Sequence, residues 1–192
     1  MQAATKMFLA HGYRAVSMAQ IAQTAPVSKA TLYNHFDSKE ALLGGVIRAL
    51  CDGLLKTMMA PLQDNKSLEY NFSQIASSFV DLIYSENAIA IYRLIIAESH
   101  DFPELSQLFY QSGPQVALTQ FERYCQQLIQ RGLLSSQLDP KTYADVFFSL
   151  LKGEAHLQCL LGIRELPSRE EKQQIVKQAI TFYLQGINNV KA

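Results

Sequence analysis

The chain has 192 residues, 48% of them hydrophobic and 18% charged, and this balance excludes an intrinsically disordered protein. Its basic and acidic residues cancel to a net charge of zero, which by itself argues against a nucleic-acid partner. Apolar runs such as AIAIYRLIIA are interrupted by Arg93 and too short to cross a bilayer, and no basic start followed by an apolar region suggests a secretory signal, so we expect a cytoplasmic protein with no membrane contact.

The first predicted elements are two short helices separated by a stop signal. A helix is expected over residues 2–10. Ser17 followed by Gln20 is a capping-box pattern, which predicts that a second helix begins at Met18. Pro26 then ends that helix, because proline cannot continue the backbone hydrogen-bond ladder.

Two further capping serines predict the next two helices. Ser28 is placed to cap a short helix that carries Leu32 and Phe36 inward at i, i+4 spacing. Ser38 is placed to cap a longer helix that runs to about Met59. Together with the preceding helices, this part of the chain is typical of a helix-turn-helix.

The remainder also reads as helices, with no convincing period-2 alternation. After a polar connection over 61–66, helices are expected near 67–85, 87–98, 103–112, 114–131, 140–162 and 169–189. We therefore predict an all-α protein of about nine helices. Its organisation is an N-terminal helix-turn-helix DNA-binding domain over 1–48 and a larger helical ligand-binding and dimerisation domain over 49–192.

The charges are unevenly distributed between these two domains. Residues 1–48 hold five basic side chains against two acidic ones, whereas residues 49–192 hold twelve against fifteen. A small basic lobe on a mildly acidic body fits DNA contact confined to one end.

The helix after Ser28 has the residue types of a DNA-reading helix. Val27 and Leu32 are expected to join Ile21 and Phe8 in a small core, with Ala22 at the helix crossing. Short polar side chains near a helix N-terminus can approach base edges, and tyrosine, histidine and lysine suit phosphate and sugar contacts. The residues left to face DNA are Ser28, Lys29, Ala30, Thr31, Tyr33, Asn34, His35 and Lys39.

This segment resembles the DNA-reading head of the TetR family of bacterial transcriptional regulators, whose pattern is F…G-[YF]…[ST]…IA…AGVSKGTLY-x-HF-x-SKE-x-L. The matching residues are Phe8, Gly12, Tyr13, Ser17, Ile21, Ala22, Val27, Ser28, Lys29, Thr31, Leu32, Tyr33, His35, Phe36, Ser38, Lys39, Glu40 and Leu42. The resemblance implies phosphate contacts by Ser17, Thr31, Tyr33, His35 and Lys39. It also implies that Lys29, Ala30, Thr31 and Asn34 lie near bases.

Two features depart from the family pattern. Pro26 stands where the family usually has glycine, and since proline does not adopt positive φ, we expect a slightly different turn. The family also has a basic arm and another helical turn before the position of Met1, so we expect either a shortened sequence or an absent arm. Missing basic residues would weaken DNA binding uniformly across sequences.

The body resembles one branch of the family, the AefR-like C-terminal domain, in the segments RLIIAESHDFPELSQLFYQSGP and LLKGEAHLQCLLG. The resemblance implies a small-molecule effector, and the composition favours a bulky, largely apolar one. The candidate ligand contacts are Tyr92, Phe109, Tyr110, Phe121, Phe147 and His156. For any one of these residues, a place in an ordinary hydrophobic core is the favoured alternative.

The last two predicted helices are apolar on more than one side, so each must be buried on more than one side. We expect a homodimer joined by these helices as a four-helix bundle, with a monomer core as the alternative. The expected interface residues are Phe148, Leu151, Ile180, Tyr183, Leu184 and Ile187.

The function predicted is that of a DNA-binding transcriptional regulator, a repressor released from a palindromic double-stranded operator by its effector. The alternative is a helical small-molecule-binding protein without a DNA role. An enzyme is not expected, because no catalytic or phosphate-binding motif is present. Cys51, Cys125 and Cys159 lack metal-like spacing and are expected to be buried, with a redox sensor as the alternative. No metal or cofactor is expected.

Overall fold

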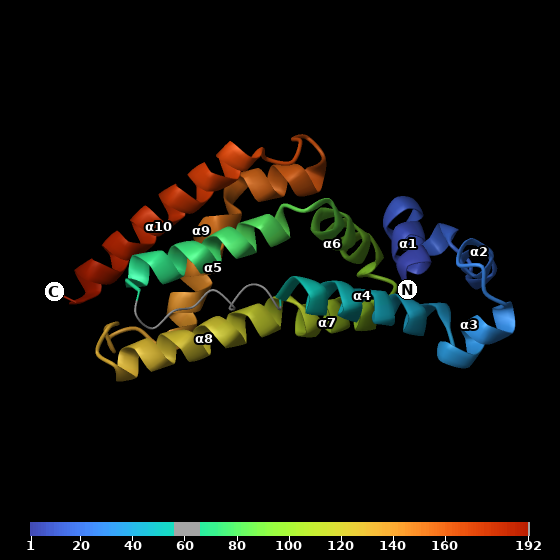
Figure 1. The fold of residues 1–192 in the computed structure, drawn as a ribbon, viewed down its shortest axis with the longest axis horizontal. Coiled ribbons are helices and arrows are strands. Elements are labelled where there is room, and N and C mark those ends of the chain that lie inside the picture. The colour runs from blue at the N-terminus through green and yellow to red at the C-terminus, as the bar shows by residue number, and fades with distance from the viewer. Residues whose placement is uncertain (56–65, 192) are drawn as a thin grey trace. The chain divides into compact units, whose positions relative to one another are not determined.

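The computed structural model describes residues 1–55 and 66–191, and these residues form ten α-helices and no strand (Figure 1). The all-α prediction is confirmed. The described residues form ten helices, whereas about nine were expected. The predicted end of a helix near Met59, and all but the last residue of the predicted connection over 61–66, lie outside the described residues. No helix in the described part of the chain combines the length and hydropathy needed to cross a membrane.

Residue contacts divide the chain into two compact units. Unit 1 comprises residues 1–53 and 86–114, and unit 2 comprises residues 54–85 and 115–192. Unit 1 therefore contains the whole predicted DNA-binding domain and two later helices as well. The division of function at residue 48 stays a prediction, because packing alone does not assign it.

Unit 1 is built from six helices, of which α4 crosses into the residues of unit 2 at its end. They are α1 (Gln2–Ala15), α2 (Met18–Thr24), α3 (Lys29–His35), α4 (Lys39–Leu55), α6 (Glu86–Glu98) and α7 (Pro103–Ser112). Helix α1 packs against α2 and α6. Phe8 of α1 and Leu43 and Ile47 of α4 are each fully buried, and the Tyr13 hydroxyl of α1 donates to Glu40 of α4, so α1 and α4 are in contact within unit 1. The α1 helix breaks at Gly12, where φ is 79°, and ends at Ala15, whereas the sequence predicted a helix over residues 2–10.

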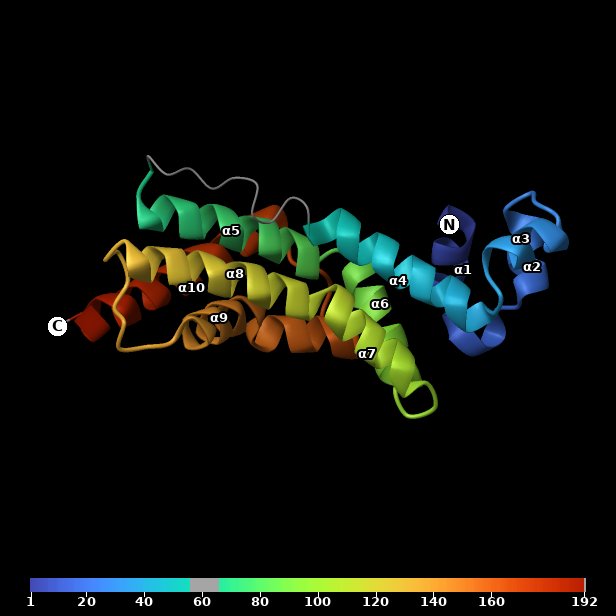
Figure 2. The ribbon, with the colours of Figure 1, turned by 90° about the horizontal axis from the view of Figure 1, so that it is seen from below.

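Unit 2 is a bundle of α5 (Leu68–Ile83), α8 (Pro114–Gln130), α9 (Pro140–Leu161) and α10 (Arg169–Lys191), of which α8 begins at the last residue of unit 1 (Figure 2). Helix α10 packs along both α5 and α9. The α9 helix breaks at Gly153, where φ is 54°. The hydroxyl of Tyr84 donates to the backbone carbonyl of Lys152 at 2.7 Å, so the carbonyl freed by the break is satisfied.

Local sequence signals account for most helix boundaries. The Ser17–Gln20 capping box is present, and the Ser28 hydroxyl accepts from the Thr31 amide at 3.0 Å. Pro103, Pro114 and Pro140 open α7, α8 and α9. The backbone N–H that proline lacks would have no partner within the helix at this position. Gly162 ends α9 in the left-handed conformation, with φ of 74°.

All three cysteines are buried, as expected. Burial raises the pKa of the Cys51 thiol to about 11 and that of the Cys125 thiol to about 12. A thiol whose pKa is raised holds less of the reactive thiolate at neutral pH, so the buried-hydrophobe interpretation is favoured over a redox sensor.

Candidate nucleic-acid interface

Helices α2 and α3 form a helix-turn-helix anchored on a small apolar core (Figure 1). Ile21 of α2 and Leu32 of α3 are buried together with Phe8 of α1, as predicted. The prediction that Val27 joins this core is wrong, because its side chain is 40% exposed. The position of α3 therefore rests on Leu32 and on the Ser28 cap.

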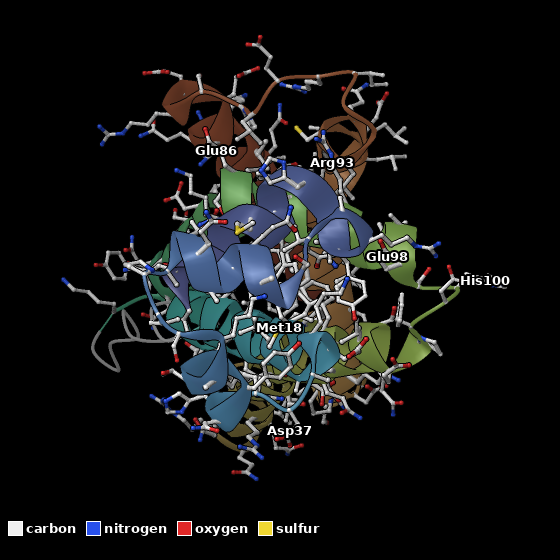
Figure 3. The ribbon with its side chains drawn as sticks, turned by 90° about the vertical axis from the view of Figure 1, so that its right-hand side faces the viewer. Met18, Asp37, Glu86, Arg93, Glu98 and His100 are labelled. Carbon is white, nitrogen blue, oxygen red and sulfur yellow. The ribbon has the colours of Figure 1, made fainter. Side chains whose placement is uncertain are left out.

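The outer face of α3 presents a contiguous set of exposed side chains, with Tyr33 half exposed. Figure 3 shows unit 1 from this end, with Met18 of α2 and Asp37 after α3 labelled. The exposed residues are Ser28, Lys29, Ala30, Thr31, Tyr33, Asn34 and His35. This face can meet an outside partner without disturbing the core.

The polar groups of this face fall into two classes. The Ser28 hydroxyl lies 2.8 Å from that of Thr31, so both have a structural partner. The same holds for Ser17 at the start of α2, whose hydroxyl bonds Gln20. Among the described residues, no hydrogen bond or ion pair occupies the side chains of Lys29, Tyr33, Asn34 or His35. Four unpartnered donors and acceptors on one helix can bind base edges or phosphate oxygens.

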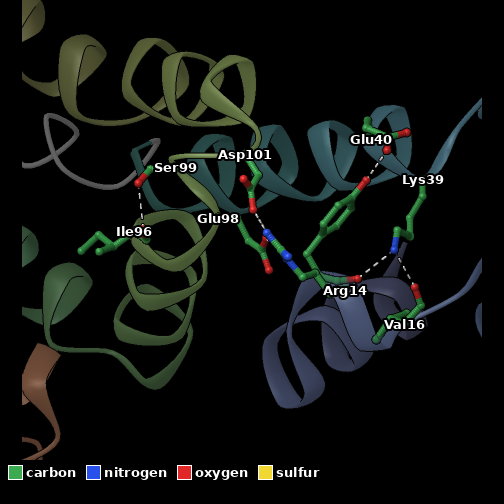
Figure 4. Close-up of polar contacts among 9 residues, drawn as sticks. Arg14, Val16, Lys39, Glu40, Ile96, Glu98, Ser99 and Asp101 are labelled. Atoms are coloured by element: carbon green, nitrogen blue, oxygen red, sulfur yellow. Dashed lines mark hydrogen bonds and ion pairs between the residues drawn. The ribbon is translucent and has the colours of Figure 1, made fainter.

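Lys39 has a different place from the one predicted. Its ammonium donates to the backbone carbonyls of Tyr13 and Val16, each at 3.0 Å, and lies 4.2 Å from the centre of the Tyr13 ring (Figure 4). The carbonyls at a helix end lack intrahelical partners, so this ammonium caps the end of α1. Lys39 thus holds the start of α4 on α1, and we no longer count it among the expected phosphate contacts.

The turn between α2 and α3 carries backbone strain at Pro26. The Val27 amide bonds the Ala22 carbonyl at 3.1 Å, which is the longer bond of a Schellman C-cap. The residue before Val27 in such a cap takes positive φ, and Pro26 has φ of 23°. The expectation that Pro26 would avoid positive φ is therefore wrong. A proline ring favours φ near −65° and supplies no N–H for the second bond of the motif.

We expect Pro26→Gly to raise the free energy of unfolding by about 1–2 kcal/mol, because glycine relieves the strained φ and restores the missing N–H donor. Urea denaturation followed by circular dichroism measures the change. The neighbouring Ala25, at an ordinary φ of −85°, provides the control: Ala25→Gly should lower stability. A loss of stability in Pro26→Gly would contradict the strain at this turn.

The predicted ligand residues do not form one cluster inside either unit. Tyr92 and Phe109 contact edge to face in unit 1, with ring centres 4.9 Å apart, while Tyr110 is half exposed. Phe121 and Phe147 stack at 4.3 Å in unit 2. His156 is buried against Tyr84. Burial lowers the pKa of His156, so this side chain is held neutral in the core.

The predicted dimer residues lie on the inner faces of α9 and α10. Phe148, Leu151, Ile180, Tyr183 and Ile187 are each at most 4% exposed within the single chain, and Leu184 is half-buried. The individual assignments are therefore wrong for the five buried side chains, which the chain's own core already covers. The apolar side chains that the same two helices expose are Val146, Leu150, Leu157, Leu161 and Phe182.

One polar cluster of unit 1 was not predicted from the sequence. Glu98 is buried and contacts Arg14, which lies 84 positions earlier. Arg14 also forms an ion pair with Asp101, and Tyr13 donates to Glu40. No local pattern connects residues this far apart, so periodicity and capping signals could not find the cluster.

Residues 1–46 match the family model described as bacterial regulatory proteins, tetR family, and residues 71–186 match that of the AefR-like transcriptional repressor, C-terminal domain. Among curated proteins, the HTH-type transcriptional repressor DhaR of Mycobacterium sp. (strain GP1) is 38% identical over 60 residues, which are 31% of this chain and 30% of DhaR. The first curated relatives thus match over less than half of their own length.

Solved structures resemble nearly the whole chain. The flavonoid-responsive regulator FrrA is 33% identical, with a TM-score of 0.81, over 96% of this chain and 93% of that one. A TetR-family transcriptional regulator from Mesorhizobium loti MAFF303099 is 27% identical, with a TM-score of 0.88, over 96% of this chain and 92% of that one.

Proposed function

From the premise that this chain belongs to the TetR family of bacterial transcriptional regulators, with an AefR-like C-terminal domain, we propose that α3 binds an operator in the major groove of double-stranded DNA. The family resemblance and the branch predicted from the sequence are both confirmed. The observation that carries the proposal is the exposed face of α3, whose Lys29, Tyr33 and Asn34 have no polar partner among the described residues.

Each exposed residue has a proposed part in binding. Lys29 and Asn34 can donate to base edges, and Ala30 can contact a thymine methyl group. Tyr33 and His35 suit phosphate and sugar oxygens, which fix the helix on the duplex without reading sequence. The hydroxyls of Ser17, Ser28 and Thr31 can add phosphate contacts while keeping their capping roles. The basic excess of residues 1–48 supports contact at this end.

We further propose that the protein represses transcription and that a small, largely apolar molecule releases it from DNA. The repressor names of DhaR and of the AefR-like domain support the sign of regulation. FrrA is described as flavonoid-responsive, which makes aromatic molecules of that size the first effector class to test.

A second copy of the chain is the expected partner. Five apolar side chains of α9 and α10 are 38–65% exposed: Val146, Leu150, Leu157, Leu161 and Phe182. Exposed apolar groups gathered on two long helices mark an association surface more often than a solvated one. In a twofold dimer, two heads would meet half-sites of a palindrome about 34–36 Å apart, or a multiple of that distance.

The proposed function is tested by selecting DNA sequences with the purified protein at two salt concentrations. We expect an enriched palindrome whose affinity falls steeply as salt rises, because phosphate contacts release counterions. Absence of any enrichment, also with an N-terminally extended and ligand-stripped protein, would favour a helical small-molecule-binding protein without a DNA role. Catalysis forms no part of the proposal.

We expect Tyr33→Ala to weaken operator binding about tenfold or more, because it removes a phosphate or sugar contact from α3. Fluorescence anisotropy with the selected operator measures the loss. Tyr110 is the matched control, since both tyrosines are 50% exposed. Tyr110→Ala should bind as the wild type does, and equal losses in both variants would move the recognition surface away from α3.

A further inference from the structure

Two adjacent residues near the end of α1, Tyr13 and Arg14, contact different elements of unit 1. The Nε atom of Arg14 donates to the Oε2 atom of Glu98, the last residue of α6, at 3.2 Å. The same guanidinium forms an ion pair with Asp101 in the turn between α6 and α7 (Figure 4). One side chain therefore bridges two carboxylates of one turn.

Arg14 and Glu98 differ in their exposure, and the difference makes the contact specific. The Glu98 side chain is only 10% exposed, whereas that of Arg14 is 65% exposed. A buried carboxylate needs a compensating charge and good geometry, while an exposed pair alone contributes little. Glu98 thus fixes where the guanidinium lies, and the more exposed Asp101 adds a second contact from the turn itself.

The neighbouring Tyr13 connects the same turn to the start of α4. Its ring packs edge-on against Phe102 with centres 4.8 Å apart, and its hydroxyl donates to the Glu40 carboxylate. The hydrogen bond from Tyr13 lowers the pKa of Glu40, and burial raises the pKa of Tyr13. At neutral pH the phenol therefore remains a donor and the carboxylate an acceptor.

These contacts lie directly before the DNA-reading helices. Arg14 is three residues from Ser17, whose capping box starts α2, and Lys39 closes the α1 end from the α4 side. A displacement of the α6–α7 turn would pull on Arg14 and Tyr13 and so on the entry to α2. Helix α7 also approaches α4, since a Cβ at Gly44 would lie 3.0 Å from the Leu108 side chain. The approach of Leu108 to Gly44 is apolar and has no preferred direction. The contacts of Arg14 with Glu98 and Asp101 are directional and hold the turn at one position relative to α1.

We propose that Arg14, bridging Glu98 and Asp101, is a latch through which the α6–α7 turn and the DNA-reading helices influence each other. The latch rests on the proposed DNA binding by α3, and it names the contacts through which that binding is regulated. Coupling is reciprocal by thermodynamic linkage. Operator binding at α3 therefore stabilises the turn at residues 98–102, although every proposed DNA contact lies outside that turn.

Hydrogen–deuterium exchange with the selected operator duplex tests the latch without knowledge of the effector. In the wild-type protein, operator should slow amide exchange in α3 and also, by about fivefold or more, in the 98–102 turn. In the double variant Arg14→Met/Glu98→Gln, which leaves no buried unpaired charge, α3 should still be protected and the turn should not. The charge swap Arg14→Asp/Asp101→Arg, made together with Glu98→Gln, should keep part of the protection, because one ion pair then still joins residue 14 to the turn.

Lys6→Met is the matched control, because Lys6 is an exposed basic residue of the same helix and its substitution removes one positive charge from α1, as Arg14→Met does. It should show the wild-type pattern. Protection of α3 without protection of the turn in the wild type would overturn the latch and leave the DNA role standing. Turn protection that persists in the double variant would also overturn it. No protection of α3 by any selected DNA would overturn both proposals.

Discussion

The double variant Leu157→Glu/Phe182→Glu is expected to be monomeric and to bind its operator about 100-fold or more weakly than the wild type. Phe182 of α10 is 65% exposed and Leu157 of α9 is 55% exposed, so neither substitution empties the chain's own core. Both side chains lie on the helices proposed to form the twofold bundle. Buried unpaired carboxylates oppose association strongly, whereas they are harmless on a free surface.

The loss of affinity follows from bivalence. Two heads on one dimer engage two half-sites, and the second contact is intramolecular once the first has formed. A monomer keeps every α3 contact and loses only this gain. Sedimentation velocity gives the mass, and anisotropy with full and half operators gives the affinity. The monomer should bind the half operator as well as it binds the full one.

Ile96→Glu serves as the control, because Ile96 is 61% exposed but lies on α6. This variant should remain dimeric and bind the full operator normally. A dimeric double variant would show that the subunits associate through another surface. A monomeric one with undiminished affinity would show that a single head suffices for operator binding.

The predictability of this fold depended on the range of the interactions. The Ser17–Gln20 capping box lies within four residues and occurs as the sequence predicts, and Ser168 and Glu171 form a second box of the same length. Helix boundaries set by such local bonds can be read from one sequence. The contact between Arg14 and Glu98 spans 84 positions and has no local signature, so it required the structure.

The residues of the candidate sites were also harder to predict than the helices, because their burial and contacts depend on packing between distant segments. Periodicity predicted that α9 and α10 are apolar on more than one face, but it could not tell which face the chain itself covers. Phe148 and Ile180 were therefore assigned to the dimer interface, although the chain's own core buries them and Leu157 and Phe182 are the exposed side chains of these helices. Lys39 has the residue type of a phosphate contact, yet its ammonium caps α1. Residue type indicates what a side chain can bind, and packing decides what it does bind.

The aromatic residues of unit 2 leave a choice between a packed core and a ligand pocket, and Phe121→Ala decides it. Phe121 is fully buried in α8, stacks on Phe147 at 4.3 Å, and lies within 6 Å of the rings of Phe72 and Phe148. Truncating a ring in such surroundings removes its contacts and leaves a cavity. We expect a loss of about 3–5 kcal/mol in the free energy of unfolding.

Thermal and urea unfolding at one fixed protein concentration measure the loss, since dimerisation makes the apparent stability depend on concentration. Tyr110→Ala, at a half-exposed tyrosine, should stay within about 0.5 kcal/mol of the wild type. A dry apolar cavity also binds small aromatic molecules, so benzene should restore part of the stability of Phe121→Ala and leave the wild type unchanged. If Phe121→Ala loses less than about 1 kcal/mol, and benzene stabilises the wild type as well, the ring borders an open pocket. Phe121 and Phe147 would then line the effector site.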